Sequence, residues 1–236
     1  DGSIEMIGKN FPKVEIIKNS QNLGFAKANN QGIKKSSGKY ILLLNSDTEI
    51  KNDALEKLLE TIKEDDDIGV VGGKLLNPDE SLQPSAGFFP NLIKIFYWMF
   101  FIDDIPLLKN VLKPYHVEDK SFYEKTQKTD WVTGACFMLR REIIEQTGLI
   151  DENIFMYGEE MEWCFRIKNK GFKVVFTPNA QILHLKGASG EFNAAGILEE
   201  FKAIMYFYKK HKPALQLLLV RFILMSGALL RIIVFG

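Results

Sequence analysis

The sequence predicts an α/β protein in which helices cover the faces of a central sheet. The run Tyr40–Leu44 consists of five apolar or aromatic residues with polar chain on both sides. Such a run is typical of a strand buried on both faces. Amphipathic helical patterns lie on either side of it, over residues 24–37 and 52–63. This alternation predicts βαβ units with right-handed crossovers and a mostly parallel sheet.

Composition limits the class of protein. With 236 residues, the chain is long enough for one large domain or a domain with an appendage. Its 46% hydrophobic content is ample for a core, and its 30 basic and 30 acidic side chains balance, which argues against nucleic acid as the main partner. Cys136 and Cys164 stand far apart in apolar runs without metal-ligand spacing, so we expect buried free thiols in a reducing compartment.

The first half of the chain reads as alternating strands and helices. We expect Asn52 to cap the helix over 52–63 and Gly38 to end the helix over 24–37. Residues 72–90 are rich in Gly, Pro, Ser and Asn, and predict a loop or hairpin. The expected strands of this half cover 14–17, 40–44 and 68–71.

The second half contains an aromatic segment and then a second ordered region. Residues 92–101 are too short to span a bilayer, which needs about 20 apolar residues. They favour an acceptor-binding lid or an interfacial patch over a core helix. Residues 103–129 predict a variable loop. Beyond it we expect strands at 131–139, 174–176 and 181–185, with Pro178 between the last two, and helices at 140–147 and 158–171.

The C-terminal tail differs from the rest, and we divide the chain into a domain of residues 1–200 and a helical segment of residues 201–236. The tail holds six Lys or Arg and no Asp or Glu. Residues 201–212 predict one helix, and 214–235 are mostly apolar. An Arg near the centre of a spanning helix costs about 2.5–3.5 kcal/mol, so Arg221 and Arg231 favour a helix that lies on a membrane surface. The alternative is a buried docking helix.

Polar residues follow the strand over 40–44 directly. Ligands of open α/β sheets bind beyond the carboxyl ends of the strands, where Asn45, Asp47 and Glu49 would stand. Their oxygens are hard ligands suited to Mg²⁺ or Mn²⁺. The alternative reading is a turn and a helix cap, a common use of Asn and Asp.

Three acids crowd the start of the helix that follows Gly158. The helix dipole accounts for one or two of Glu159, Glu160 and Glu162, but mutual repulsion opposes a third. Crowding raises a carboxyl pKa, which suits a general base. His184 ends a strand and has either a structural or a functional role. Four residues near the N-terminus form ordinary caps and turns or contact a nucleotide, namely Asn22, Gly24, Asn29 and Asn30.

Taken together, these residues resemble family 2 glycosyltransferases, in particular their rhamnosyltransferase-like branch. The resemblance covers most of residues 1–189 and consists of five segments in the order of the family. They are Asn22-Leu-Gly-Phe-Ala with Asn29-Asn30-Gln-Gly32; Leu44-Asn-Ser-Asp-Thr; Trp131-Val-Thr-Gly-Ala; Phe155-Met-Tyr-Gly-Glu-Glu-Met-Glu-Trp-Cys-Phe-Arg166; and Gly171-Phe with Pro178 and His184.

The resemblance implies a GT-A fold, a nucleotide-diphosphate sugar donor and Mg²⁺ or Mn²⁺. Asn45-Ser46-Asp47 matches the Asp-x-Asp motif with Asn in place of the first acid, which leaves Asp47 as the expected metal ligand. His184 matches a histidine near the donor diphosphate and is the second candidate ligand. The other donor-binding candidates are Asn22, Gly24, Asn29, Asn30 and Asn45.

The same resemblance implies which residues lie on the acceptor side of the site. Glu160 matches the catalytic base, one methylene longer than the usual Asp, and Glu159 precedes it. The expected acceptor pocket contains Thr133, Gly134, Ala135 and Glu162. The family opens with a strand, a helix and a second strand around the nucleotide base. Residues 1–3 resemble the end of that second strand, so we expect a chain that lacks the first unit.

The resulting hypothesis is an inverting, metal-dependent glycosyltransferase that acts on a glycan or lipid-linked acceptor. We expect it in the cytoplasm, at the inner face of the cell membrane. The first alternative is a sugar-nucleotide-binding module without turnover, because the base pocket is incomplete. The second is a nucleotidyltransferase, which needs a basic phosphate-binding loop near its start, and this sequence has none there.

Overall fold

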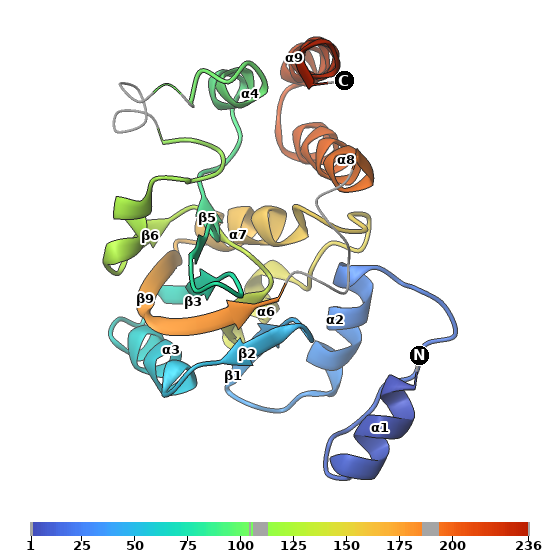
Figure 1. The fold of residues 1–236 in the computed structure, drawn as a ribbon, viewed down its shortest axis with the longest axis vertical. Coiled ribbons are helices and arrows are strands. Elements are labelled where there is room, and N and C mark those ends of the chain that lie inside the picture. Colours follow the sequence, from blue (N-terminus) through green and yellow to red (C-terminus); the bar gives the residue numbers. More distant parts are fainter. Residues whose placement is uncertain (1, 104, 106–112, 186–193, 236) are drawn as a thin grey trace.

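The computed structural model describes residues 2–103, 105, 113–185 and 194–235. A twisted central sheet carries helices on both faces, and further helices lie beyond one end of it (Figure 1). The helices are α1 (Ser3–Asn10), α2 (Phe25–Lys35), α3 (Ala54–Lys63), α4 (Leu92–Met99), η1 (Lys120–Glu124), α6 (Glu142–Thr147), α7 (Glu159–Asn169), α8 (Ala194–His211) and α9 (Ala214–Phe235). The strands are β1 (Tyr40–Leu44), β2 (Thr48–Ile50), β3 (Ile68–Leu76), β4 (Leu82–Gln83), β5 (Ala86–Gly87), β6 (Gln127–Thr129), β7 (Trp131–Val132), β8 (Cys136–Arg140) and β9 (Lys173–His184).

The sheet confirms the α/β class, but its strand directions differ from the expectation. The strand order is β1-β8-β3-β9-β2, with β4 beside β3 and β6 beside β9. β8 runs antiparallel to both β1 and β3, whereas β3 and β9 are parallel. The prediction of a mostly parallel sheet is therefore wrong, because β8 separates two strands that point the same way. β1, β3 and β9 still share one direction, so their carboxyl ends lie at one edge.

Two hydrophobic clusters occupy the two faces of this sheet. On one face, Leu58 and Ile62 of α3 pack against residues of β3 and β9. On the other face, Phe137 of β8 stacks on Trp163 of α7 with ring centroids 5.6 Å apart. Cys136 and Cys164 are buried free thiols, as expected.

The N-terminal part differs from the prediction at three points. Residues 1–3 were expected to be the end of a strand, but Ser3 is the first residue of helix α1. Residues 14–17 form no strand, and Val14 is 54% exposed without a neighbouring strand to cover it. The helix predicted over 52–63 is confirmed as α3, which begins at Ala54, but Asn52 does not cap it. Asp53 holds the N-cap position, and Asn52 adopts a left-handed backbone with φ 48° in the turn before it.

Several strand boundaries were also predicted wrongly. β3 continues through Gly72 and Gly73 into the expected loop, because these glycines admit close neighbours. A Cβ on Gly72 would lie 2.6 Å from the Cβ of Val132. The strand expected over 131–139 is divided by a turn at residues 133–135. β9 is continuous past Pro178, where its pairing with β3 shifts register between Gly73 and Lys74.

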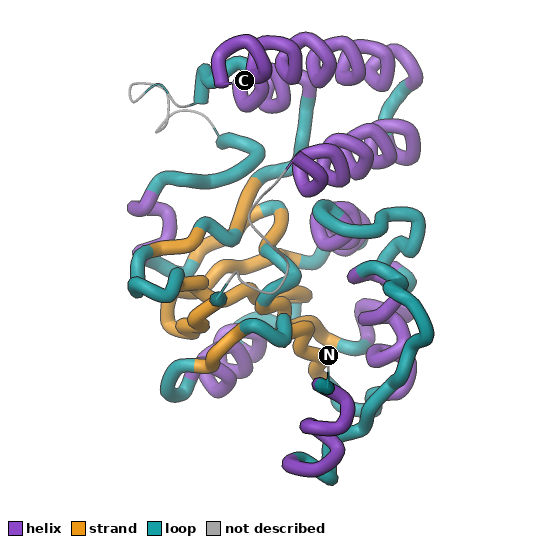
Figure 2. The backbone as a smooth tube through the Cα atoms, turned by 45° about the vertical axis from the view of Figure 1, so that its right-hand side comes forward, coloured by secondary structure: helices purple, strands orange, loops and turns teal. Residues whose placement is uncertain are grey.

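α4, α8 and α9 form the end of the molecule away from the sheet, and Figure 2 displays α9 across this end. The helix predicted from residue 201 begins at Ala194 as α8. α4 packs against α9, since a Cβ on Gly227 would lie 2.6 Å from the Cβ of Met99. Arg231 Nη2 donates to the Trp98 carbonyl at 2.6 Å. The region predicted as variable loop contains η1 and β6, and residues 104 and 106–112 lie outside the described residues.

Candidate functional site

The carboxyl ends of β1 and β9 bring Asp47 and His184 together. β1 ends at Leu44, and the chain turns back through Thr48, which pairs with His184 as the first residue of β2. Leu185 N donates to the Asp47 carbonyl at 2.8 Å. Asp47 Oδ1 then lies 3.3 Å from His184 Nε2, and the two side chains are 15% and 13% exposed. Two residues 137 positions apart in the sequence therefore share one small site.

Asn45 and Gln83 complete the surroundings of His184. Asn45 Nδ2 lies 3.3 Å from His184 Nε2. On the other side of the ring, His184 Nδ1 lies 2.6 Å from Gln83 Oε1. Sequence reasoning missed Gln83, because this residue stands in a Gly- and Pro-rich segment without any periodic pattern. Its place in β4, beside β3, is known only from the structure.

Asp47 and His184 fit a divalent cation by their chemistry. A carboxylate oxygen and an imidazole nitrogen lie 3.3 Å apart here, and both are atom types that ligate divalent cations. Across the ranges that the structure describes, no three side chains of His, Cys, Asp or Glu gather as a metal-binding group. A cation held here needs most of its ligands from phosphate oxygens or water, as is usual for Mg²⁺ at nucleotide sites.

The second part of the site is the start of α7. Gly158 precedes the helix with φ 118°, a conformation that favours glycine. Glu160 folds back over this turn, so that Gly158 N donates to its Oε2 at 3.2 Å and Gly134 N donates to its Oε1 at 3.4 Å. Burial raises the pKa of Glu160 despite these two hydrogen bonds. Among the described residues, no Lys or Arg forms an ion pair with it.

Glu159 points into the interior beside Glu160. It is 3% exposed, and its Oε2 has no hydrogen-bond partner among the described residues. Burial, and then the charge of Glu160, hold the pKa of Glu159 well above its usual range. The neutral form is therefore favoured more strongly at Glu159, the more deeply buried of the two carboxyls, than at Glu160.

The turn at Thr133, Gly134 and Ala135 connects the two parts of the site. Asn45 N donates to the Ala135 carbonyl at 3.2 Å, and Gly134 N contacts Glu160 from the same turn. A Cβ on Gly134 would lie 2.7 Å from the Phe25 ring at the start of α2. The residues that follow β1, the start of α2 and the start of α7 therefore meet at residues 133–135.

The four N-terminal candidates have different surroundings. Asn22 is exposed, and its Oδ1 accepts a hydrogen bond from Gly24 N at 2.9 Å. Gly24 has φ 78°, and a Cβ there would lie 2.6 Å from the Phe155 carbonyl. Asn29 Nδ2 donates within its own helix to the Phe25 carbonyl at 2.9 Å. Asn30 is buried, and it contacts residues 150 and 152 of the loop before α7 through three hydrogen bonds.

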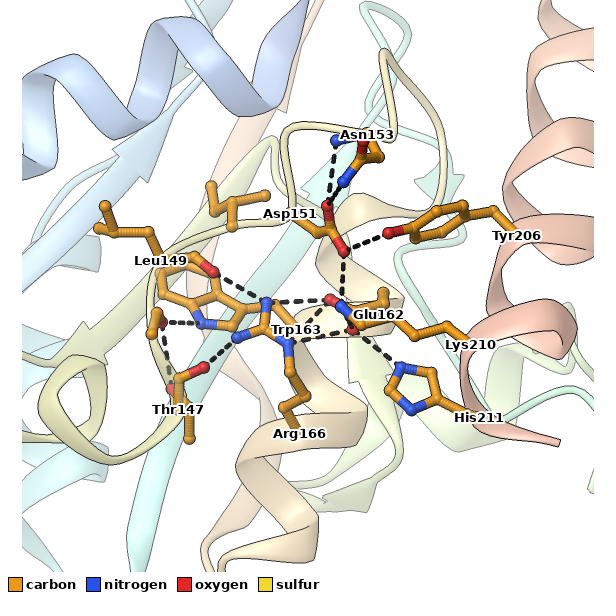
Figure 3. Close-up of polar contacts among 12 residues, drawn as sticks. Thr147, Leu149, Asp151, Asn153, Glu162, Trp163, Arg166, Tyr206, Lys210 and His211 are labelled. Atoms are coloured by element: carbon orange, nitrogen blue, oxygen red, sulfur yellow. Dashed lines mark hydrogen bonds and ion pairs between the residues drawn. The ribbon is translucent and has the colours of Figure 1, made fainter.

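Glu162 lies in a buried ionic network, drawn in Figure 3, rather than beside Glu160 and residues 133–135. It is fully buried, and Arg166 Nε donates to both of its oxygens at 3.0 and 2.9 Å. Lys210 and His211 of α8 reach the same carboxylate at 2.8 and 2.9 Å. Burial acts to raise the pKa of Glu162, but hydrogen bonds and charges from these partners lower it overall. The network anchors the end of α8 to α7.

This network predicts a large effect on stability. Removing one partner of a buried ion pair costs about 3–5 kcal/mol. We expect Arg166→Met to lower the free energy of unfolding by about 3 kcal/mol, because Lys210 and His211 still compensate part of the Glu162 charge. Urea denaturation followed by circular dichroism measures this change.

The matched control is the exposed pair of Lys35 and Glu15, whose side chains are 53% and 67% exposed. We expect Lys35→Met to change the same free energy by less than about 1 kcal/mol. Equal effects of the two substitutions would contradict a structural role for the buried network.

α8 also brings Glu200 toward the start of α7, which the sequence did not indicate. Glu200 is buried, and its Oε1 lies 2.7 Å from His116 Nε2. The negative charge of Glu200 adds to the raised pKa of Glu160. A cavity of about 490 Å³ has His116 in its wall, together with Trp98 of α4, Phe122 of η1 and Arg231.

Comparison with protein families matches residues 1–148 to the model described as glycosyl transferase family 2. An N-acetylglucosaminyl-diphospho-decaprenol L-rhamnosyltransferase of Mycobacterium tuberculosis is 24% identical over 208 residues, which are 80% of this chain and 64% of that protein. A dTDP-rhamnosyl transferase, RfbF, of Shigella flexneri is 27% identical over 74% of this chain and 53% of its own length. The chain therefore spans about half to two thirds of these two relatives.

Two solved structures share the fold. GalNAc-T7 with UDP, GalNAc and Mn²⁺ superposes with a TM-score of 0.57 at 17% identity, over 87% of this chain and 38% of that one. The mannosyltransferase PcManGT of Pyrobaculum calidifontis, with GDP-Man and Mn²⁺, gives a TM-score of 0.57 at 14% identity, over 97% of this chain and 61% of that one. At this level of identity the likeness concerns the GT-A fold alone.

Proposed function

The chain belongs to glycosyl transferase family 2, and from this membership we propose that it transfers a sugar from a nucleotide-diphosphate donor to a hydroxyl of a glycan or lipid-linked acceptor. The observation that carries the proposal is the Glu160 carboxylate. It is partly buried, held by two backbone N–H groups and has a raised pKa. These are the properties of a general base.

In the proposed reaction, Glu160 accepts the proton of the acceptor hydroxyl as the hydroxyl oxygen attacks the anomeric carbon. The new C–O bond forms on the face opposite the leaving nucleoside diphosphate, whose bond to the anomeric carbon breaks, so the configuration inverts. Burial and the charge of Glu160 favour the neutral form of Glu159, which limits the repulsion between the two carboxyls. Thr133, Gly134 and Ala135 form the wall of the acceptor pocket next to Glu160.

Asp47 and His184 are the residues that we propose hold Mg²⁺ or Mn²⁺ at the donor diphosphate, with Asn45 beside them. Such a cation neutralises the developing charge of the departing diphosphate. The facing oxygen and nitrogen of this pair support the assignment. The Mn²⁺ and nucleotides named with GalNAc-T7 and PcManGT are consistent with it. Asn22, Gly24 and Asn29 surround the start of α2 and are proposed to contact the nucleotide, whereas Asn30 positions the loop before α7.

A nucleotide-release assay tests this function. The chain is incubated with UDP-, GDP- and dTDP-sugars, with and without Mn²⁺, in the presence of a polyprenyl-diphosphate N-acetylglucosamine acceptor. We expect release of nucleoside diphosphate that requires both the cation and the acceptor. Binding of a sugar nucleotide by calorimetry without release or transfer would instead favour a non-catalytic binding module.

We also propose that α9 lies on the surface of a membrane, at its inner face if the acceptor is lipid-linked. Residues 214–234 are long and apolar enough to cross a bilayer, yet Val220 and Leu224 pack against the protein and Arg231 is tied to α4. The opposite face of the helix is apolar and exposed, comprising Leu215, Leu218, Phe222, Met225, Leu229, Ile232 and Ile233. One apolar outer face, with six basic and no acidic residues in 201–236, suits an anionic lipid surface better than a span.

Flotation with liposomes tests this surface. Each apolar side chain of this size contributes about 1.5–3 kcal/mol on burial. We expect the double substitution Leu218→Glu and Phe222→Glu to lower partitioning into vesicles with one quarter phosphatidylglycerol by about 100-fold or more. Leu55→Glu on α3, far from α9 (Figure 1), is the matched control and should float like the unsubstituted chain. Equal flotation of all three proteins would rule out α9 as the part of the protein that contacts the membrane.

A further inference from the structure

We propose that Gln83 is a positioning residue that places the imidazole proton of His184 on Nδ1. Nε2 is thereby kept as a hydrogen-bond acceptor and metal ligand beside Asp47. The inference rests on the proposed function for the use of Nε2, but the position of the proton follows from hydrogen bonds within this chain. It assigns a role to a residue that makes no direct contact with the donor-side residues other than His184.

The orientation of the Gln83 amide is determined by two acceptors. Gln83 is 3% exposed, in β4. Its Nε2 donates to Asn77 Oδ1 at 2.9 Å and to the His184 carbonyl at 3.4 Å. Both partners are oxygens that accept, so the amide nitrogen must face them, and Oε1 must face the His184 ring. Asn77 is held in turn, because its Nδ2 donates to Ser81 Oγ at 2.9 Å.

This orientation specifies where the imidazole proton lies. Gln83 Oε1 can only accept, and it is 2.6 Å from His184 Nδ1, so Nδ1 carries the hydrogen. The hydrogen bond at the other nitrogen of the ring indicates the same position of the proton. Asn45 Nδ2 donates toward His184 Nε2 at 3.3 Å, which requires a lone pair on Nε2. Two separate hydrogen bonds therefore specify the same tautomer.

The role of Gln83 arises from competition between two acceptors. Asp47 Oδ1 is 3.3 Å from Nε2 and would itself accept the proton of the opposite tautomer. In that tautomer Nε2 donates to Asp47 and has no lone pair left with which to bind a cation. The short hydrogen bond to Gln83 holds the proton at the far nitrogen. Such outer-shell hydrogen bonds to a ligating histidine typically change metal affinity by about 10- to 100-fold.

The test combines a direct measurement of the tautomer with metal binding. The chain contains three histidines, so long-range ¹H–¹⁵N correlation spectra of histidine-labelled protein at pH 8 are readily assigned with a His184→Ala reference. We expect Nδ1 to be protonated in the unsubstituted chain and in Gln83→Glu, which keeps an acceptor. In Gln83→Met, which has nearly the same length and no acceptor, the proton should shift to Nε2, and Mn²⁺ binding measured by electron paramagnetic resonance should weaken by about 10- to 100-fold.

Asn77→Leu is a second variant that tests whether Gln83 positions the proton of His184. It removes the acceptor that orients the Gln83 amide, so we expect a mixture of tautomers, and it covers the case in which Gln83→Met does not fold. A proton that stays on Nδ1 in both variants would overturn the proposal. If the proton moves but His184→Ala binds Mn²⁺ normally, the positioning role stands and the metal-ligand role of His184 fails.

Discussion

Replacing Glu160 with glutamine should lower kcat by about 10²- to 10⁴-fold, the usual contribution of a general base. Glutamine keeps the size, and its single oxygen can accept one of the two hydrogen bonds that Gly134 N and Gly158 N donate to the carboxylate, but it cannot take a proton. Donor binding measured by calorimetry should remain close to that of the unsubstituted chain, because Glu160 acts on the acceptor. The rate is measured as release of nucleoside diphosphate in the presence of acceptor.

Glu159→Gln is the matched control for this substitution. Burial and the charge of Glu160 raise the pKa of Glu159 and favour its neutral form, which an uncharged amide resembles. We expect kcat to fall by less than about 10-fold, since only positioning changes. Equal losses in the two variants, or unchanged turnover in Glu160→Gln, would refute the assignment of Glu160 as the base.

The pH profile provides an independent measurement of the same role. A general base must be deprotonated to act, so kcat/KM should rise as the pH rises through the pKa of Glu160. Burial raises that pKa, and the rising limb should therefore lie above the usual range of a glutamate. In Glu160→Gln this limb should disappear from the residual activity. A limb of the same shape in both proteins would assign the titration to another group.

Replacing Asp47 with alanine should lower kcat/KM by about 10²- to 10⁴-fold. Stabilisation of the developing charge by a bound cation amounts to several kcal/mol, and each 1.36 kcal/mol is tenfold in rate. Asp47 is the one acid in contact with His184 among the described residues, and its side chain is mostly buried. We expect Mn²⁺ affinity to fall together with activity, and electron paramagnetic resonance measures that affinity directly.

The control for Asp47→Ala is Glu49→Ala, which removes a carboxylate two residues away. Glu49 is exposed on β2 and faces Leu183 in the pairing with β9. Its loss should change Mn²⁺ affinity and kcat/KM by less than about twofold, since exposed charges contribute little. Unchanged turnover in Asp47→Ala would eliminate this residue as a metal ligand, whereas equal losses in both variants would indicate a general effect of charge.

Local sequence patterns were sufficient to predict most of the helices and strands and to indicate the family. The apolar run at Tyr40–Leu44 and the stripes of α2 and α3 each depend on neighbours in the sequence, and the structure confirms them. The loop or hairpin predicted from Gly72 onward was wrong at its start, because glycine occurs both in turns and in strands where a neighbour comes close. In β3 it admits the side chain of Val132, a neighbour 60 residues away that no local pattern indicates.

The sequence by itself determined the α/β class, the family resemblance and the identity of Asp47, Glu160 and His184 as candidates, because each depends on residue type and order. Only the tertiary structure decided which of them meet. The pairing of β2 with β9 carries His184 to Asp47, and the turn at residues 133–135 contacts both Asn45 and Glu160. The tertiary structure also separates the side chain of Glu162 from that of Glu160, two residues earlier, because α7 turns the two side chains toward different partners. The contact between Gln83 and His184 is known only from the tertiary structure, because a hydrogen bond between residues 101 positions apart leaves no periodic pattern in the sequence.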